Sequence, residues 1–106
     1  MYKDINVNEL KDKIFNREEV VLLDVRTKEE YEQGHLENSI LVPYDELEKR
    51  HKELNIDTDL MVVIYCRSGR RSLIAASMLE RLGYKNLFNV LGGIVEWEKN
   101  GYPVSK

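Results

Sequence analysis

The sequence predicts one α/β domain that contains a mainly parallel sheet with helices on both faces. Short apolar runs rich in β-branched residues alternate with segments of helical pattern along the chain. The runs at residues 20–25 and 60–65 are almost continuously apolar, which is typical of strands buried on both faces of a parallel sheet. A length of 106 residues suits one domain, so we expect residues 1–106 to form a single unit.

The first helix is expected at residues 7–15. Leu10 and Ile14 are four residues apart in this segment, which places both on one helical face. Asn8 is the predicted N-cap, because an asparagine side chain can accept a hydrogen bond from a free backbone N–H of the first turn. Ile5, just before the helix, is expected to pair as a short edge strand.

A buried strand is expected at residues 20–25, and its polar exception is Asp24, near the carboxyl end. Thr27 and Glu30 then form a capping-box pattern, in which each side chain accepts a hydrogen bond from the other residue's backbone N–H. A short helix is therefore predicted here. It should end at Gly34, since glycine readily adopts the left-handed backbone that closes a helix.

The middle of the chain is expected to contain a brief strand and a charged helix. Residues 39–42 form the predicted strand, and Pro43 closes it because proline lacks the N–H group that a sheet requires. Asp45 is the predicted N-cap of the helix, which should run past Arg50 to Leu54.

The last third of the chain is expected to alternate helix, strand and helix. Residues 72–82 have the pattern of a helix that is apolar on most faces and ends at Gly83. A last strand is expected at residues 87–90, and a glycine turn leads from it into a closing helix that carries Trp97 in the core. Residues 101–106 are expected to form a tail.

Composition and charge argue against several classes of function. A net charge of −3 disfavours nucleic acid as a partner, since phosphate binding normally shows as an excess of basic residues. No apolar stretch is long enough to span a bilayer and the first residues resemble no targeting peptide, so we expect a cytosolic protein with no membrane partner. One cysteine and two histidines allow no internal disulfide and supply zinc ligands poorly, so no metal or cofactor is predicted.

The only cysteine, Cys66, lies where the apolar run at residues 60–65 ends, and the sequence Arg-Ser-Gly-Arg-Arg-Ser follows it. Nearby arginines and the N-terminus of the next predicted helix both favour a thiolate, which is the nucleophilic form of cysteine. The backbone must curl between Cys66 and Ser72 so that several N–H groups point inward. Gly69 permits the backbone angles that such a curl requires.

The residues after the cysteine are therefore the predicted anion-binding site. The planar guanidinium group of arginine suits oxyanions such as sulfonate, thiosulfate or phosphate. No histidine is adjacent to the cysteine in sequence, so we expect the loop, more than a paired base, to activate the thiol. The expected catalytic residue is Cys66, and the expected substrate-binding residues are Arg67, Ser68, Gly69, Arg70, Arg71 and Ser72.

The length of this loop favours sulfur chemistry over phosphate chemistry. A cysteine phosphatase places its phosphate-binding arginine six positions after the cysteine, where this chain has Ser72. Arg71 comes five positions after Cys66, so the loop is one residue shorter. A tighter nest of N–H groups suits a terminal sulfur atom better than a tetrahedral phosphoryl group.

Four segments of the chain resemble the motifs of single-domain rhodanese-type sulfurtransferases, in the family's order. The cysteine loop is similar to the family's active-site pattern C-R-x-G-x-R. The other similar segments are Leu22-Leu23-Asp24-Val25-Arg26 followed by Glu29, Glu30 and Tyr31; Gly34-His35-Leu36 through Pro43; and Leu91-Gly92-Gly93 with Trp97. The similarity covers nearly the whole chain.

The resemblance implies a rhodanese-like three-layer α/β/α domain with a five-stranded sheet. It also implies a reaction in which the Cys66 thiolate takes the outer sulfur of thiosulfate, releases sulfite, and passes the sulfur from a persulfide to an acceptor. By the same resemblance the backbone of residues 67–72 would cradle the persulfide, and Arg67 and Arg71 would attract the anionic donor. Asn38 stands where the family favours glycine, and asparagine tolerates left-handed backbone nearly as well.

Several of these residues also have a structural interpretation. A lone cysteine can be a core residue, and Arg70 is as compatible with solvent as with substrate. Asp24 and Arg26 are expected to support the site through a salt bridge or hydrogen bonds to a neighbouring loop rather than to transfer protons. His35 is expected to be a hydrogen-bonded scaffold residue, and His51 is expected to lie on the surface.

Three functions remain open from the sequence. The first is a sulfurtransferase that uses a small anionic donor such as thiosulfate, with cyanide, a thiol, or a thioredoxin-like or sulfur-relay protein as acceptor. The second is a sulfur-carrier or regulatory module that receives persulfide from a partner protein. The third is a cysteine phosphatase or arsenate reductase, which the short loop disfavours. A monomer is expected in each case.

Overall fold

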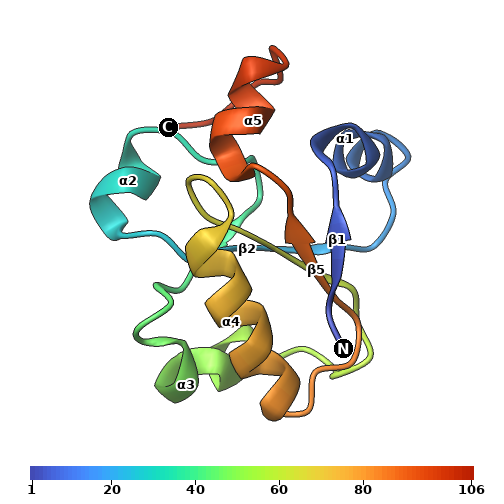
Figure 1. The fold of residues 1–106 in the computed structure, drawn as a ribbon, viewed down its shortest axis with the longest axis vertical. Helices are drawn as coiled ribbons and strands as arrows, with labels where there is room; N and C mark the ends of the chain where they lie inside the picture. Colours follow the sequence, from blue (N-terminus) through green and yellow to red (C-terminus); the bar gives the residue numbers. More distant parts are fainter.

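Five parallel strands form one sheet in the order β1-β5-β4-β2-β3 (Figure 1). The computed structural model describes all residues from 1 to 106. The predicted α/β class is confirmed, and every hydrogen-bonded pair of strands is parallel. The strands are β1 (Lys3–Ile5), β2 (Val21–Asp24), β3 (Ile40–Leu41), β4 (Val62–Tyr65) and β5 (Leu87–Val90).

Helices cover both faces of the sheet, which confirms the three-layer α/β/α arrangement (Figure 1). Side chains alternate along β4, so Val62 and Ile64 pack with the helices at residues 47–50 and 70–81, while Val63 and Tyr65 pack with the helices at residues 7–15 and 93–99. None of the helices has the length and apolar character needed to cross a membrane. The helices are α1 (Val7–Phe15), α2 (Lys28–Glu32), α3 (Leu47–Arg50), the 3₁₀ helix η1 (His51–Leu54), α4 (Arg70–Arg81) and α5 (Gly93–Lys99).

The N-cap of α1 is Asn6, so the prediction of Asn8 is wrong. Asn6 Oδ1 accepts a hydrogen bond from the Glu9 N–H at 2.8 Å, and Glu9 Oε1 accepts one from the Asn6 N–H at 3.0 Å. This reciprocal pair satisfies two free N–H groups at once, which a cap at Asn8 could not do. The capping box predicted for Thr27 and Glu30 is present at the start of α2.

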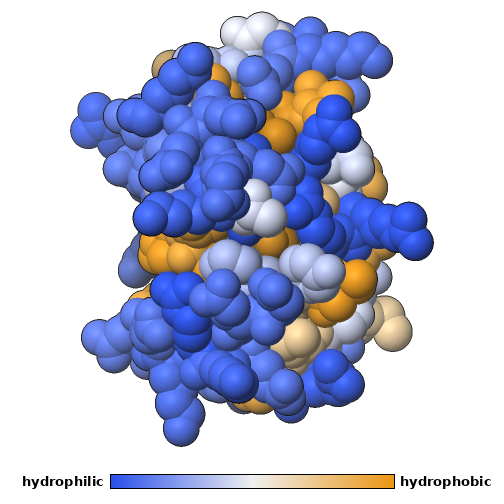
Figure 2. Space-filling model, turned by 90° about the vertical axis from the view of Figure 1, so that its left-hand side faces the viewer, coloured by the Kyte–Doolittle hydropathy of each residue, from blue (hydrophilic) through white to orange (hydrophobic).

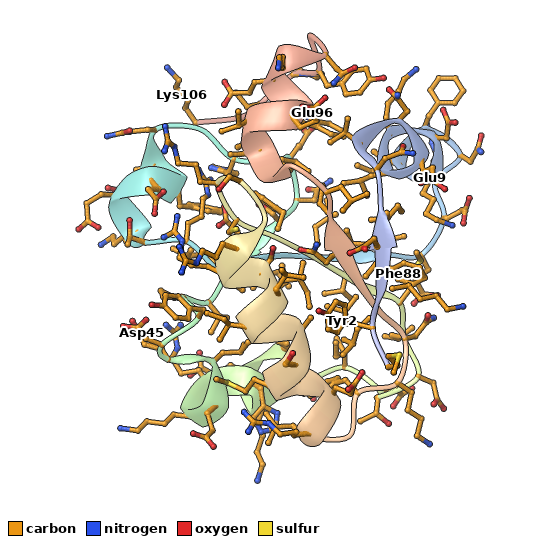
Figure 3. All side chains as sticks on the ribbon, viewed as in Figure 1. Tyr2, Glu9, Asp45, Phe88, Glu96 and Lys106 are labelled. Carbon is orange, nitrogen blue, oxygen red and sulfur yellow. The ribbon has the colours of Figure 1, made fainter.

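The charged helix predicted from Asp45 to Leu54 is wrong in its start and in its continuity. α3 begins at Leu47 without a side-chain cap, and after Arg50 the chain changes to η1, which ends at the left-handed Asn55. Figure 3 shows Asp45 in the segment before α3. Only Leu47 and Leu54 are buried here, so packing fixes the two ends of the segment without requiring one continuous helical face.

Helix α4 begins at Arg70, before the predicted start, because Gly69 takes the N-cap position. The expectation that this helix is apolar on most faces is also wrong. Leu79 is buried, whereas Leu73 is 38% exposed and Ile74 is 49% exposed. The apolar contribution of α4 to the core therefore comes from one face, and small residues on that face allow the helix to lie close to the sheet.

Residues 101–106 are packed rather than a free tail. The Trp97 indole N–H donates to the Pro103 carbonyl at 2.8 Å, and the Tyr102 ring meets the Trp97 ring edge-on with centroids 4.9 Å apart. Ser105 pairs with His35 in an antiparallel bridge. The end of the chain therefore covers Trp97 and joins α5 to the segment after α2.

The face of the molecule that carries α2 and α3 is mostly hydrophilic, with hydrophobic residues in small separate patches (Figure 2).

His35 has the expected scaffold role, since its Nδ1 lies 2.8 Å from the Tyr31 carbonyl oxygen and its ring stacks on the Tyr31 ring. His51 is not a simple surface residue. It is half-buried, and its Nδ1 lies 3.0 Å from the Tyr84 hydroxyl.

Candidate active site

Cys66 directly follows β4, the central strand, at the carboxyl edge of the sheet. The direction in which strands are added reverses between the neighbouring strands β2 and β4, because β2 leads to β3 on one side and β4 leads to β5 on the other. Ligand sites in parallel α/β sheets lie at such a switch point. Asp24, at the end of β2, pairs in register with Tyr65, so Asp24 and Cys66 share this edge as the sequence predicted.

The Cys66 thiol is enclosed by the loop that follows it. The side chain is only 1% exposed, and the Gly69 backbone N–H donates to Sγ at 3.1 Å. Gly69 has a φ of 109°, in the region that favours glycine, so the curl that points this N–H inward depends on the absence of a side chain. The thiol in turn donates to the Ser72 hydroxyl, with Sγ and Oγ 3.5 Å apart.

The loop makes the thiol more acidic than an ordinary cysteine. Burial raises the pKa of the Cys66 thiol, but hydrogen bonds to the sulfur outweigh burial and leave the pKa below its usual value. The backbone N–H groups of Ser72, Gly69 and Ser68 donate to the sulfur and favour its charged form. Because the thiolate is the reactive form, this environment favours nucleophilic attack by Cys66.

Helix α5 holds the outer side of the loop in place. The Ile94 N–H donates to the Cys66 carbonyl at 3.0 Å, and the Val95 N–H donates to the Arg67 carbonyl at 3.1 Å. This close approach needs glycine at position 93, because a Cβ atom on Gly93 would lie 2.5 Å from the Cys66 carbonyl oxygen. The Gly-Gly segment that the sequence singled out is therefore a support for the loop backbone.

The three arginines of the loop differ in their surroundings. Arg71 forms a two-pronged ion pair with Glu30 of α2, at 2.8 and 2.9 Å. The Arg71 guanidinium is the main reason that the pKa of Glu30 is lowered to about 2. Arg67 and Arg70 are exposed and form no ion pair. The loop therefore has two free cations and one that is already neutralised.

Asp24 and Arg26 form a buried ion pair beside the loop. The Arg26 Nη2 lies 2.7 Å from Asp24 Oδ2, and the same nitrogen donates to the Gly34 carbonyl at 2.7 Å. Arg26 is 5% exposed and Asp24 is fully buried. The salt bridge and the hydrogen bond to a neighbouring loop that the sequence predicts are both present, and no hydrogen bond connects the pair to the Cys66 sulfur.

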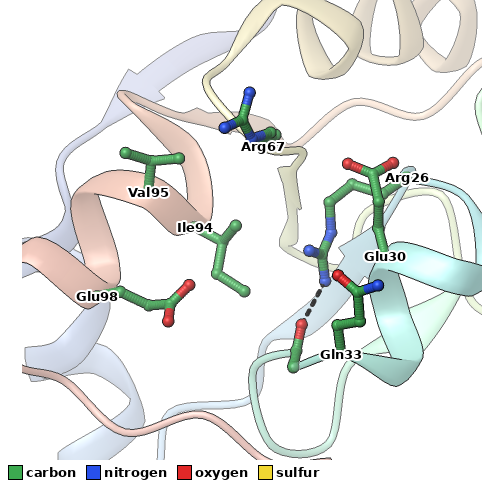
Figure 4. Close-up of a pocket in the computed structure, with 8 residues that line it drawn as sticks. Arg26, Glu30, Gln33, Arg67, Ile94, Val95 and Glu98 are labelled. Carbon is green, nitrogen blue, oxygen red and sulfur yellow. Dashed lines mark hydrogen bonds between the residues drawn. The ribbon is translucent and has the colours of Figure 1, made fainter.

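A cavity of about 320 Å³ lies next to the loop, between α2 and α5 (Figure 4). It is lined mainly by charged and polar side chains, which include Arg26, Glu30, Gln33, Arg67 and Glu98. Sequence reasoning found Glu30 as a helix cap but not as the partner of Arg71, because the two residues are 41 positions apart and no local pattern connects them. No pattern in the sequence indicated that Gln33 and Glu98 line a cavity. No three His, Cys, Asp or Glu side chains are grouped so that they could hold a metal ion.

The parallel sheet and the cysteine-centred loop at its carboxyl edge define the rhodanese-like class of α/β domains. Residues 6–100 match the rhodanese-like domain family, and the chain belongs to this family. The resemblance inferred from the sequence motifs is thus confirmed.

Individual relatives agree with this assignment. A sulfurtransferase of Allochromatium vinosum is 36% identical over 104 residues, which cover 98% of this chain and 95% of that protein. A putative sulfur carrier protein of Bacillus subtilis is 37% identical over 94 residues, which cover 89% of this chain and 50% of that protein. The crystal structure of a rhodanese-related protein from Thermoplasma volcanium superposes with a TM-score of 0.84, at 36% identity and with 98% of each chain covered.

Proposed function

We propose that this protein is a sulfurtransferase that moves sulfane sulfur from thiosulfate or a persulfide donor through a persulfide on Cys66. The observation that carries the proposal is the position of the thiol, where the Gly69 N–H donates to Sγ at 3.1 Å and the loop lowers the pKa of the thiol. The relative named as a sulfurtransferase matches nearly the full length of this chain and supports the same class of reaction.

Each half of the reaction exchanges one bond to sulfur. The Cys66 thiolate attacks the outer sulfur of thiosulfate, the S–S bond of thiosulfate breaks, and sulfite leaves with the electron pair. An acceptor, cyanide or a thiolate, then attacks the outer sulfur of the persulfide, and the Cys66 thiolate leaves with the bonding pair. The products are thiocyanate or a new persulfide, and no external oxidant or reductant is needed.

The other residues of the loop have roles set by charge and backbone direction. The exposed Arg67 and Arg70 attract the anionic donor, and Arg71 adds to them once Glu30 releases it. The inward N–H groups of residues 67–72 hold the negatively charged sulfur of the thiolate and of the persulfide.

Intact-mass measurement with thiosulfate tests this proposal. The wild-type protein is expected to gain one sulfur atom, and addition of cyanide should remove that sulfur and release thiocyanate. The Cys66→Ala variant should do neither. A wild-type protein that gains no sulfur, or a Cys66→Ala variant that gains as much as wild type, would show that Cys66 does not carry sulfur in this reaction.

A second function, as a sulfur-carrier module, is favoured by the closed state of the site. Cys66 is 1% exposed, and Glu30 neutralises the arginine that would otherwise bind a small anion. The relative named as a putative sulfur carrier matches this chain over half of its own length. Here the expected result is a Cys66 persulfide that forms only with a persulfide-loaded partner protein, with negligible turnover of free thiosulfate.

The phosphatase and arsenate reductase alternative is tested with an aryl phosphate. The short loop disfavours it, so neither wild type nor Cys66→Ala should hydrolyse p-nitrophenyl phosphate. Hydrolysis by wild type alone would reverse this conclusion.

We propose further that residues 1–106 act as one domain, as a monomer, in a cytosolic setting. A reducing compartment would keep Cys66 as a free thiol, which the reaction requires. Size-exclusion chromatography with light scattering tests the monomer.

A further inference from the structure

A chain of hydrogen bonds connects the surface of the sheet edge to the Cys66 sulfur. Asn89 is 2% exposed and is a polar residue in the otherwise apolar interior of β5. It pairs in register with Asp4 of the edge strand β1, and its Nδ2 lies 3.2 Å from Asp4 Oδ1. Its Oδ1 lies 2.5 Å from the Ser72 hydroxyl oxygen, and Ser72 Oγ is 3.5 Å from Cys66 Sγ.

The chemistry of Asp4 sets the direction of every bond in this chain. A carboxylate can only accept hydrogen bonds, so the Asn89 amide must turn its NH₂ group toward Asp4 and its carbonyl toward Ser72. The carbonyl then accepts the single proton of the Ser72 hydroxyl. The Ser72 oxygen is left to accept from the thiol of Cys66, and this arrangement stabilises the neutral thiol.

The opposite direction would stabilise the thiolate. If the Asn89 amide turned over, its NH₂ group would donate to the Ser72 oxygen, and the Ser72 proton would be free to point at the sulfur. Both directions use the same atoms and the same spacing. The Asp4 carboxylate blocks the second direction, because the Asn89 carbonyl would then face a negatively charged oxygen with no proton between them.

We propose that Asp4 is a positioning residue that, through Asn89 and Ser72, holds the Cys66 sulfur in its less nucleophilic hydrogen-bonding state. The proposal rests on the proposed role of Cys66 as nucleophile and extends the active site to the far edge of the sheet. Asp4 is exposed, so a molecule that binds its carboxylate would release the restraint.

The rate of Cys66 alkylation by iodoacetamide, followed against pH, tests the proposal without any sulfur transfer. In Asp4→Ala the amide is free to turn, so the pH midpoint of alkylation should fall by about half a unit to one unit, with a rate near neutral pH about threefold to tenfold higher. Asp4→Asn should show a smaller effect, because an asparagine can face either side of the Asn89 amide. Circular dichroism checks that each variant is folded.

The Ser72→Ala background distinguishes a direct effect of the Asp4 charge on Cys66 from an effect that passes through the hydrogen bonds of Asn89 and Ser72. Arg71, its partner Glu30, and the exposed Arg67 and Arg70 remain the same in all variants, so their fields cancel in the comparison.

In the Ser72→Ala background the Asp4→Ala substitution should leave the pH midpoint of alkylation unchanged, because the hydrogen-bond connection to the sulfur is already lost. Asp12→Ala, which removes an exposed carboxylate of α1, should also leave the midpoint unchanged. The proposal is overturned if Asp4→Ala does not lower the midpoint, or if the shift persists without the Ser72 hydroxyl. Because alkylation needs no sulfur donor, a failure here is distinct from a failure of the thiosulfate reaction.

Discussion

Arg71 can neutralise one anion at a time, and in the structure that anion is Glu30. The ion pair is two-pronged and only 26% and 27% of the two side chains are exposed, so a donor anion must compete with a carboxylate that is already in place. Arg67 and Arg70 carry no such partner. At the level of single residues, the affinity of the loop for an anion therefore depends on Glu30 as well as on the arginines.

Glu30→Gln is expected to lower the KM for thiosulfate by about threefold to tenfold, because it frees the Arg71 guanidinium for the donor. Glutamine can still accept from the Thr27 N–H, so the cap of α2 is preserved. Thiocyanate formation at varied thiosulfate concentration measures the effect, and Glu29→Gln is the matched control on the same helix. An unchanged or higher KM would mean that Glu30 positions Arg71 for catalysis instead of competing for it.

At the scale of elements, the cysteine loop depends on α5 as much as on α4. The N–H of Gly69, the N-cap of α4, donates to the Cys66 sulfur, whereas N–H groups in the first turn of α5 donate to the carbonyl groups of Cys66 and Arg67 from outside. Both contacts require glycine, Gly69 for the curl and Gly93 for the close approach. The loop is thus held between two helix starts, and neither strand nor cysteine alone determines its shape.

Gly93→Ala should damage this arrangement strongly. The new Cβ would lie 2.5 Å from the Cys66 carbonyl oxygen and 2.6 Å from that of Arg67, and backbone atoms cannot give way easily. We expect the free energy of unfolding to fall by about 2–4 kcal/mol, measured by urea denaturation, with slower Cys66 alkylation.

Gly101→Ala is the control that separates the steric clash expected for Gly93→Ala from the backbone strain that a positive φ causes. Gly101 has a φ of 79° and no atom within 4 Å of its Cβ position, so this substitution should cost only about 1 kcal/mol. Equal effects of the two substitutions would contradict the supporting role of α5.

For the whole molecule, the sequence was informative where local signals agree with the fold. Apolar runs located the strands, and the turn and cap residues Thr27, Gly34 and Gly83 located helix ends, because each signal acts within a few neighbours. The position of Cys66 at the end of a buried strand followed from the same local signals. Asn38 adopts the left-handed backbone that its position in the family pattern requires.

Contacts between residues that are distant in the sequence could not be predicted from it. Glu30 with Arg71, Asn89 with Asp4, and the packing of Ser105 on His35 join residues that no local pattern connects. The segment at residues 45–54 failed for a related reason, because burial of its two leucines, and not helix propensity, decides where its helices begin and end.

The Glu30–Arg71 pair connects α2 to α4, so it should also make the stability of the whole fold depend on pH. The pKa of Glu30 is about 2 in the folded protein, against an ordinary value of 4.5, so its charged form is favoured by folding. This contribution is fully present above pH 4.5 and is lost as the pH falls toward 2.

Urea denaturation at several pH values should therefore show wild type more stable than Glu30→Gln by about 1 kcal/mol at pH 7, since partial exposure weakens such pairs. The difference should shrink steadily below pH 4.5 and approach zero near pH 2. Glu29→Gln, on the exposed side of α2, should follow the wild-type curve throughout. A difference between wild type and Glu30→Gln that stays constant down to pH 3 would show that the charge of Glu30 is not the source of the lost stability.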